Sequence, residues 1–155
     1  ICMKHKREKP FKPKRGQVDY SKARWAPVVN CVVRYRGTIL LVKRNAGMRL
    51  YPGYWNGVSG FLDDRQSLEE KVSSELREEL GIKRTDIKTI RLGTIFHDDA
   101  PRYKKTWIVH PVLVDVATNA VRLDWEAEEY AWVHPRDISA YNVIPGFKNV
   151  LKAVL

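Results

Sequence analysis

The sequence predicts an α+β fold in which a mixed β-sheet is sandwiched between α-helices. The chain has 155 residues, which suits one domain with one hydrophobic core. Its apolar fraction is 44%, which is typical of globular proteins and excludes a disordered chain. Short runs with strand-like composition outnumber the helical runs, and the two helical runs stand in mid-chain and at the end. This order predicts a mixed sheet that is covered by helices.

The strands are predicted from runs rich in β-branched and aromatic residues. Residues 26–35 (APVVNCVVRY) form the first run, and the Arg36-Gly37 turn joins it to a hairpin partner over 38–44. Residues 45–59 contain several Gly and Pro residues, which indicates a loop with short extended pieces. Further strands are expected at 87–97, 106–117 and 129–134, with a turn near Thr118-Asn119 after the second of these.

The helix in mid-chain has clear signals at both ends. Ser67 is a good N-cap, and Glu70 completes a capping box. Gly81 is placed to end the helix. An apolar residue recurs every fourth position and forms the stripe expected to be buried: Leu68, Val72, Leu76 and Leu80. A closing helix is expected to start near Pro145 and to bury Val150, Leu151, Val154 and Leu155.

Three glutamates lie on one face of the mid-chain helix. At about 100° per residue, Glu75, Glu78 and Glu79 share a face, and Arg77 points to nearly the opposite side. Like charges at this spacing destabilise a helix slightly. A bound cation would offset the repulsion, and hard carboxylate oxygens select Mg²⁺ or Mn²⁺. Helix geometry alone leaves this interpretation level with a second one, a solvated Glu-rich face.

The spacing of Gly60, Glu75, Leu76, Glu78, Glu79, Gly81 and Ile82 resembles the Nudix box, G-x5-E-x7-R-E-U-x-E-E-x-G-U, where U is aliphatic. The flanks agree: YPGYWNGVSG looks like the family's lead-in, and EAEEYAWVHPRDI looks like its late acidic strand. The resemblance reaches from about residue 26 to 141 and implies a Nudix fold. Two box positions depart from the pattern, because Gln66 replaces a Glu and Ser74 replaces an Arg. In the family these residues form a charged pair that orients the catalytic Glu.

What the resemblance implies is hydrolysis of a nucleoside diphosphate linked to another group, X, with Mg²⁺ or Mn²⁺ as cofactor. By position, Glu75, Glu78 and Glu79 are the expected metal ligands, together with the backbone carbonyl of Ser59. Glu75 is also a candidate base. Glu126 is the first candidate for a base outside the box, and Glu129 is the second.

Substrate-binding residues are predicted from the segment before the box. Arg44 and Arg49 could bind the phosphates, as could Lys43, although a surface charge is the plainer interpretation of each. Tyr51 and Trp55 could stack on a base, although core packing is as good an interpretation for Trp55. Asp98 and Asp99 could face the site, but a plain turn is the preferred interpretation of their segment.

Two other functions are weighed against hydrolysis. The first is a catalytically weak Nudix domain that binds a nucleotide or RNA, which the Gln66 and Ser74 departures support. Retention of all three box glutamates argues against it, because a pure binding domain does not need them. The second is isomerisation of an isoprenyl diphosphate, for which the catalytic Cys segment of that family is missing.

Residues 1–24 are interpreted as a basic N-terminal tail, and residues 25–155 as the Nudix domain. The tail carries a net charge of +7 out of +10. It is either a solvated tail or an arm that makes a weak contact with RNA.

Cys2 and Cys31 are the only cysteines, and a reducing cytoplasm is the expected location. No run is long enough to suggest a membrane span. Cys2 and His5 alone are a weak signal for zinc. A homodimer is an open alternative, because dimers are common in the family.

Overall fold

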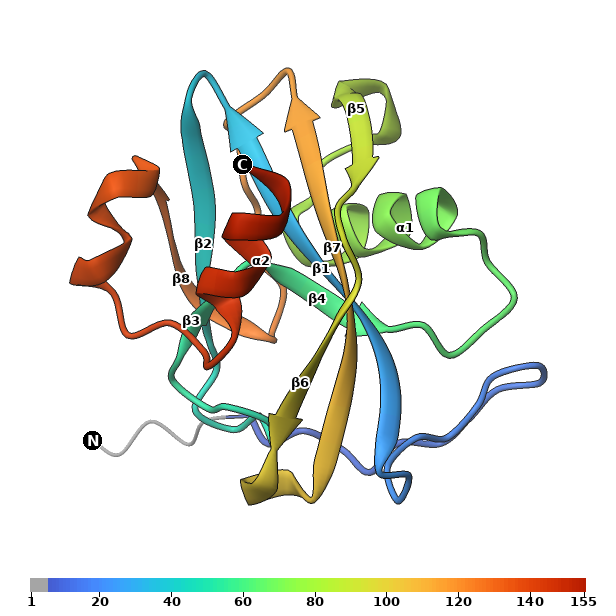
Figure 1. Cartoon of the computed structure of the whole chain (residues 1–155). Helices are drawn as coiled ribbons and strands as arrows, with labels where there is room; N and C mark the ends of the chain where they lie inside the picture. Colours follow the sequence, from blue (N-terminus) through green and yellow to red (C-terminus); the bar gives the residue numbers. More distant parts are fainter. Residues whose placement is uncertain (1–5) are drawn as a thin grey trace.

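The computed structural model describes residues 6–155, whose strands form one mixed sheet with a helix on each face (Figure 1). Cys2 and His5 lie outside the described residues. In chain order the elements are β1 Trp25–Tyr35, β2 Thr38–Arg44, β3 Trp55–Asn56, β4 Val58–Phe61, α1 Leu68–Leu80, the 3₁₀ segment η1 Arg84–Asp86, β5 Ile87–Leu92, β6 Phe96–Ala100, η2 Pro101–Tyr103, β7 Lys105–Val116, β8 Ala127–Val133, η3 Pro135–Ala140 and α2 Phe147–Val154.

The sheet is mixed because one central pair of strands is parallel. β1 and β7 run parallel over ten residue pairs, and the other pairings are antiparallel. The main path is β3-β2-β1-β7-β5, with β8 beside β2, β6 beside β7 and β4 beside the first half of β1. β4 therefore leads from the centre of the sheet directly into the loop before α1.

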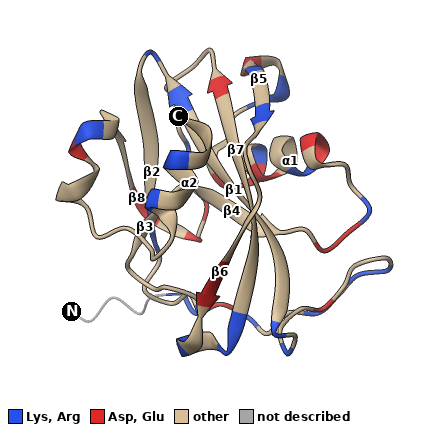
Figure 2. Ribbon diagram, in the orientation of Figure 1, with Lys and Arg blue, Asp and Glu red and all other residues tan. Residues whose placement is uncertain are grey.

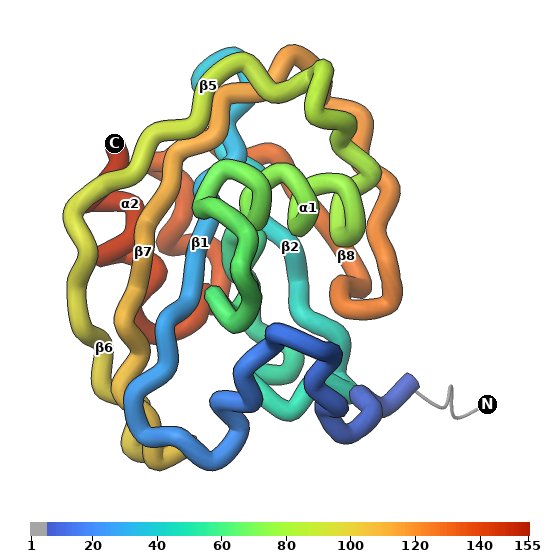
Figure 3. Tube along the Cα trace, turned by 90° about the vertical axis from the view of Figure 1, so that its right-hand side faces the viewer, coloured from blue at the N-terminus to red at the C-terminus, as the bar shows by residue number. Residues whose placement is uncertain are grey.

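Alternate residues of the central strands point into two separate hydrophobic cores. One core holds Val29, Cys31 and Val33 of β1 against Val72, Leu76 and Leu80 of α1. The other holds Ala26 and Val32 of β1 against Phe147, Val150, Leu151 and Val154 of α2. α1 lies in front of the sheet and α2 behind it in Figure 3. The predicted sandwich is thus confirmed.

Two expectations for the second half of the chain are wrong in detail. The single strand expected at 87–97 is two strands, β5 and β6, which pair with successive parts of β7. The break comes at Gly93, which packs closely against the C-terminal end of α2. A Cβ at this position would lie 2.4 Å from the carbonyl oxygen of Ala153. Leu155, which was expected to be buried, is 52% exposed because α2 ends one residue before it.

The segment before β1 packs along the domain and has no helix or strand within residues 6–24 (Figures 1 and 3). The backbone N–H of Glu8 donates to the carbonyl of Gly47, and that of Val18 donates to the carbonyl of Asp63. The Lys105 ammonium donates to the carbonyls of Tyr20, Ser21 and Ala23. These contacts are more than a freely solvated tail would make. Within residues 6–155, no helix is long and apolar enough to cross a membrane.

Candidate active site

Helix α1 positions the box glutamates because its two ends and its buried stripe are all defined by local sequence. The Ser67 side chain accepts from the backbone N–H of Glu70, and the Glu70 carboxylate accepts in return from the backbone N–H of Ser67. Gly81 adopts the left-handed conformation, with φ 67°, and its N–H bonds back to the last turn. Val72, Leu76 and Leu80 are buried against the sheet. This seating turns Glu75 and Glu79 toward a pocket.

The pocket has a volume of about 700 Å³, a size suited to a small-molecule ligand. Its walls come from β4, the box face of α1, the loop after β2, the loop before β8 and residues 8–21 of the N-terminal segment. Acidic residues lie on α1 and on β6, and basic residues lie along the N-terminal segment (Figure 2). The residues by which this segment lines the pocket are themselves acidic, polar or apolar and include no Lys or Arg: Glu8, Phe11, Gln17, Val18, Asp19, Tyr20 and Ser21.

Three carboxylates gather at the α1 side of this pocket. Glu79 is hydrogen-bonded to both Glu75 and Glu126, although Glu126 lies far along the chain in the loop before β8. Burial raises the pKa of Glu79 well above its usual value, and the neighbouring Glu126 and Glu75 raise it further. Burial also raises the pKa of Glu75, against the lowering effects of Glu79 and Lys71. The carboxyl groups of this cluster therefore cannot all be ionised at once without a free-energy cost.

This donor set suits a divalent cation. Carboxylate oxygens are the ligands that Mg²⁺ and Mn²⁺ prefer, and the excess negative charge is what a cation would relieve. The carboxyl groups are hydrogen-bonded to one another. Within residues 6–155, no three Asp, Glu, His or Cys side chains are already placed to coordinate one metal ion. Glu78 and Ser59 also line the pocket, with Glu78 exposed. Their roles as ligands stay predictions.

Three of the four predicted substrate-binding residues line the pocket. The Arg44 Nε donates to the carbonyl of Leu50 at 2.8 Å. Burial lowers the pKa of Arg44, whereas Glu79 and Glu126 raise it. Arg49 is more exposed, and its Nε lies 3.5 Å from the Glu8 carboxylate of the N-terminal segment. The Tyr51 hydroxyl accepts from the indole N–H of Trp107.

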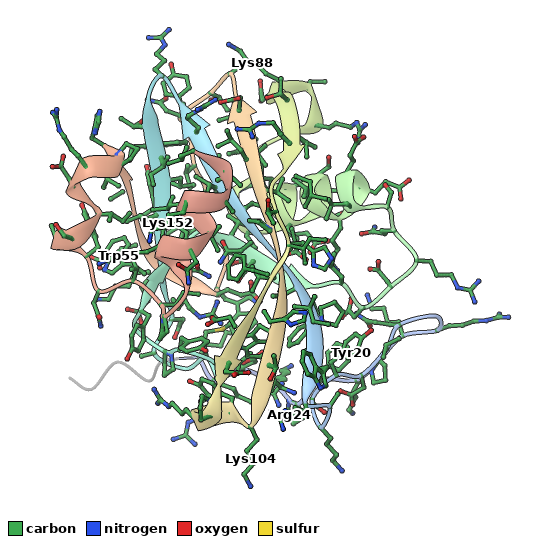
Figure 4. All side chains as sticks on the ribbon, in the orientation of Figure 1. Tyr20, Arg24, Trp55, Lys88, Lys104 and Lys152 are labelled. Atoms are coloured by element: carbon green, nitrogen blue, oxygen red, sulfur yellow. The ribbon has the colours of Figure 1, made fainter. Side chains whose placement is uncertain are left out.

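Trp55, the fourth predicted residue, lies outside the pocket lining. It is in β3, where its ring packs edge-on against Tyr141 and its backbone bonds to residues 142 and 144. Figure 4 shows it beside α2, far from Tyr20. Core packing therefore accounts for the position of Trp55, away from the pocket that the other three residues line.

The second candidate base is also directed away from the pocket. Glu129 is exposed in β8, and its carboxylate lies 3.4 Å from the ammonium of Lys43. This pair accounts for both residues as surface charges. Asp98 and Asp99 are in strand β6 and not in a turn, so that interpretation is wrong. Asp98 lines the pocket, whereas Asp99 accepts a hydrogen bond from Thr106.

The two departures from the box contact each other. The Gln66 Nε2 lies 3.4 Å from the Ser74 Oγ, in an exposed position. A neutral and long hydrogen bond thus stands where the box pattern has a Glu and an Arg. Neither residue makes a side-chain hydrogen bond or ion pair with Glu75 among the contacts of residues 6–155. The charge that faces Glu75 comes from Lys71, one turn earlier in α1.

Residue-by-residue sequence reasoning missed four groups at the site. Lys71 could have been found, because it precedes Glu75 by four residues on the same helix face. Asp124 precedes Glu126 by two residues, and burial raises its pKa. The other two groups are Asp63 and the part of the N-terminal segment that lines the pocket, which are joined by a hydrogen bond from the Gln17 side chain to Asp63. Their positions depend on long-range packing and leave no local signal in the sequence.

Comparison with known proteins identifies the family of the chain. The NUDIX domain family matches residues 24–154. Nucleoside triphosphatase NudI of Escherichia coli O139:H28 is 26% identical over 133 residues, which are 81% of this chain and 93% of the relative. NudI of Klebsiella pneumoniae (strain 342) is 28% identical over 124 residues, covering 75% and 86%. A MutT NUDIX hydrolase from Burkholderia pseudomallei has the same fold, with a TM-score of 0.72, 20% identity and coverage of 84% and 98%. The chain belongs to the NUDIX domain family.

Proposed function

We propose that this protein is a metal-dependent pyrophosphohydrolase that cleaves a phosphoanhydride bond of a nucleoside triphosphate, in which X is a phosphate. The observation that carries the proposal is the partly buried cluster of Glu75, Glu79 and Glu126 beside Arg44 in one pocket. Family membership and the two NudI relatives support the pyrophosphohydrolase reaction, and the relatives also support the choice of substrate.

Each residue of the cluster has a role in this proposal. Glu75, Glu78 and Glu79 would hold Mg²⁺ or Mn²⁺, which when bound neutralises phosphate charge and activates water. Glu126 takes the proton of the attacking water, because it reaches the cluster from outside the helix. The water oxygen bonds to one phosphorus, the phosphoanhydride P–O bond breaks, and the leaving phosphate keeps the electron pair.

The positive groups and the aromatic ring on the other wall would bind the substrate. Arg44 is held by the Leu50 carbonyl next to the carboxylates, which is suitable for a phosphate of the bound nucleotide. Arg49 lies at an exposed part of the wall and would contact an outer phosphate. Tyr51 would contact the base, since its ring lines the pocket and is held by Trp107 and Tyr103.

The proposal is tested with a panel of nucleoside triphosphates, nucleotide sugars, dinucleotide polyphosphates and capped RNA, with and without Mg²⁺ or Mn²⁺. We expect cleavage of nucleoside triphosphates only with metal, and products identified by chromatography as two phosphate species. Tight binding of a nucleotide without turnover of any substrate would instead support the binding-domain alternative.

Two matched variants test the roles within the cluster. Glu126→Gln should lower kcat about 10²- to 10⁴-fold, the range for loss of a general base. Glu129→Gln removes the same charge from an exposed position nearby in β8 and should leave kcat within about twofold. Equal effects of the two substitutions would contradict the assignment of Glu126. Glu79→Gln should remove most of the activity and weaken Mn²⁺ binding, which can be measured by calorimetry.

A further inference from the structure

We propose that Lys71 is the positioning residue for the Glu75 carboxylate, in place of the charged pair that Gln66 and Ser74 no longer provide. The proposal deepens the function above and rests on it for the identity of Glu75 as an active-site group. Its observations are separate, because they concern how the carboxylate is held.

Lys71 is buried and surrounded by carboxylates. Its ammonium lies 3.3 Å from Asp63 Oδ1, 3.4 Å from Asp64 Oδ2 and 3.5 Å from Glu75 Oε1. The Lys71 side chain is only 11% exposed. Burial alone would lower the pKa of Lys71, but Glu75, Asp63 and Asp64 together raise it, so that the side chain stays charged.

Local helix stability does not explain a lysine at this position. Lys71 is in the first turns of α1, where the helix dipole disfavours a cation. A Lys that precedes a Glu by four residues is also the less stabilising order of such a pair. Burial of the long side chain adds a desolvation cost. The position is therefore explained by the groups that the ammonium contacts.

Those contacts hold Glu75 from one side. Its Oε1 is nearest to Lys71, and its carboxylate lies over Gly60, where a Cβ would be 2.6 Å from the same oxygen. The carboxylate is hydrogen-bonded to Glu79 as well. Lys71 and Glu79 thus contact the carboxylate in the space that the absent side chain of Gly60 leaves open. Asp63 and Asp64 in turn tie Lys71 to the loop that follows β4.

The Gln66–Ser74 contact cannot position the Glu75 carboxylate. It is a neutral hydrogen bond of 3.4 Å in an exposed position, and such bonds contribute little. If Lys71 has replaced the family's pair, restoring that pair should matter only when Lys71 is absent. This dependence distinguishes a positioning role from a purely structural one.

The experiment compares Lys71→Met, Lys71→Arg, the double variant Gln66→Glu/Ser74→Arg and the triple variant that combines Lys71→Met with that pair. Each is measured for kcat and KM with a nucleoside triphosphate and Mg²⁺, for the Mn²⁺ dissociation constant without substrate, and for thermal unfolding. Lys83→Met is the control, because it removes the same charge from an exposed residue just beyond the helix.

We expect Lys71→Met to lower kcat about 10- to 100-fold with KM within about threefold, the range for loss of an orienting partner. The Mn²⁺ dissociation constant should rise about tenfold or more, and Lys71→Arg should keep most of the activity. The triple variant should recover at least tenfold in kcat, whereas the pair alone should change the parent protein by less than threefold.

Several results would overturn the proposal. One is an unchanged kcat and Mn²⁺ affinity in Lys71→Met with only a lowered melting temperature, which would make Lys71 purely structural. Another is a tighter Mn²⁺ affinity, which would show that Lys71 acts only as an opposing charge. A third is an equal gain in kcat when Gln66→Glu/Ser74→Arg is introduced into the parent protein and into Lys71→Met.

Two further provisions keep the proposal testable. If Lys71→Met does not fold, Asp63→Asn/Lys71→Met removes both members of the buried pair and is measured in its place. If the parent protein hydrolyses no substrate, the proposed function fails, but the Mn²⁺ titrations still decide the role of Lys71.

Discussion

Replacing Gly60 with alanine should separate the activity of this protein from its stability. A Cβ at Gly60 would lie 2.6 Å from Glu75 Oε1 and 2.9 Å from its carboxyl carbon. Gly60 has no left-handed backbone, so alanine adds no backbone strain. The only close neighbour is the end of a flexible side chain. The added methyl group can therefore be accommodated if the Glu75 carboxylate moves.

The size of that movement sets the expected loss of activity. Ordinary van der Waals contact begins at 3.4 Å, so Oε1 has to retreat by about 0.8 Å. A displacement of about 1 Å at a reacting group costs on the order of 10²-fold in rate. We expect Gly60→Ala to lower kcat about 30- to 100-fold. The free energy of unfolding should fall by less than about 1 kcal/mol, below the cost of overpacking a rigid core.

Gly57→Ala is the matched comparison, because its Cβ would lie 2.4 Å from the backbone carbonyl oxygen of Cys31 in β1. A strand backbone cannot retreat as a side chain can, so this variant should lose at least about 1–3 kcal/mol of stability. Steady-state kinetics and urea unfolding of both variants make the comparison. The reasoning is refuted if Gly60→Ala keeps kcat within twofold, or if it loses as much stability as Gly57→Ala.

Two other properties can be tested on the surface of the protein. The Arg34 guanidinium donates two hydrogen bonds to Asp115, at 2.6 and 3.0 Å, and lowers the pKa of that carboxyl. The pair therefore stabilises the fold above about pH 4, the ordinary pKa of an Asp. This contribution is lost as the pH falls through the lowered pKa. Arg34 is 37% exposed, so Asp115→Asn should cost only about 0.5–1 kcal/mol at pH 7, and urea unfolding at pH 3 should show a smaller difference. Replacing the exposed Lys12, Lys14 and Arg15 with Gln tests the RNA arm without removing the pocket wall. Fluorescence anisotropy at low salt should show weaker binding to single-stranded RNA, with a salt slope lower by up to about 2, and unchanged binding would exclude the arm.

Helix α1 shows how much could be predicted from the sequence. Its limits are set by Ser67 and Gly81, and its buried stripe by apolar residues four apart, so each signal acts within one or two turns. The shared face of Glu75 and Glu79 follows from helix geometry alone. The spacing of the box residues along positions 60–82 then indicated the family. These features are local, and the tertiary structure changed none of them.

The tertiary structure decided which distant groups join the helix. Glu126 reaches Glu79 from the loop before β8. Glu129, three residues later, faces Lys43 because the pairing of β8 with β2 places these two residues opposite each other. Tyr51 lines the pocket and Trp55 does not, because β3 pairs with β2 and turns the indole toward Tyr141.

The N-terminal segment and the charge that faces Glu75 were decided in the same way. Charge composition predicted a basic tail, but hydrogen bonds to Asp63 and Lys105 place it against the pocket. Ser74 marks the loss of the family's arginine, yet only the folded chain brings Asp63, Asp64 and Glu75 around one buried ammonium. Periodicity and spacing report on neighbours along the chain. Contacts between separate segments depend on strand pairing and packing, which a single sequence does not display.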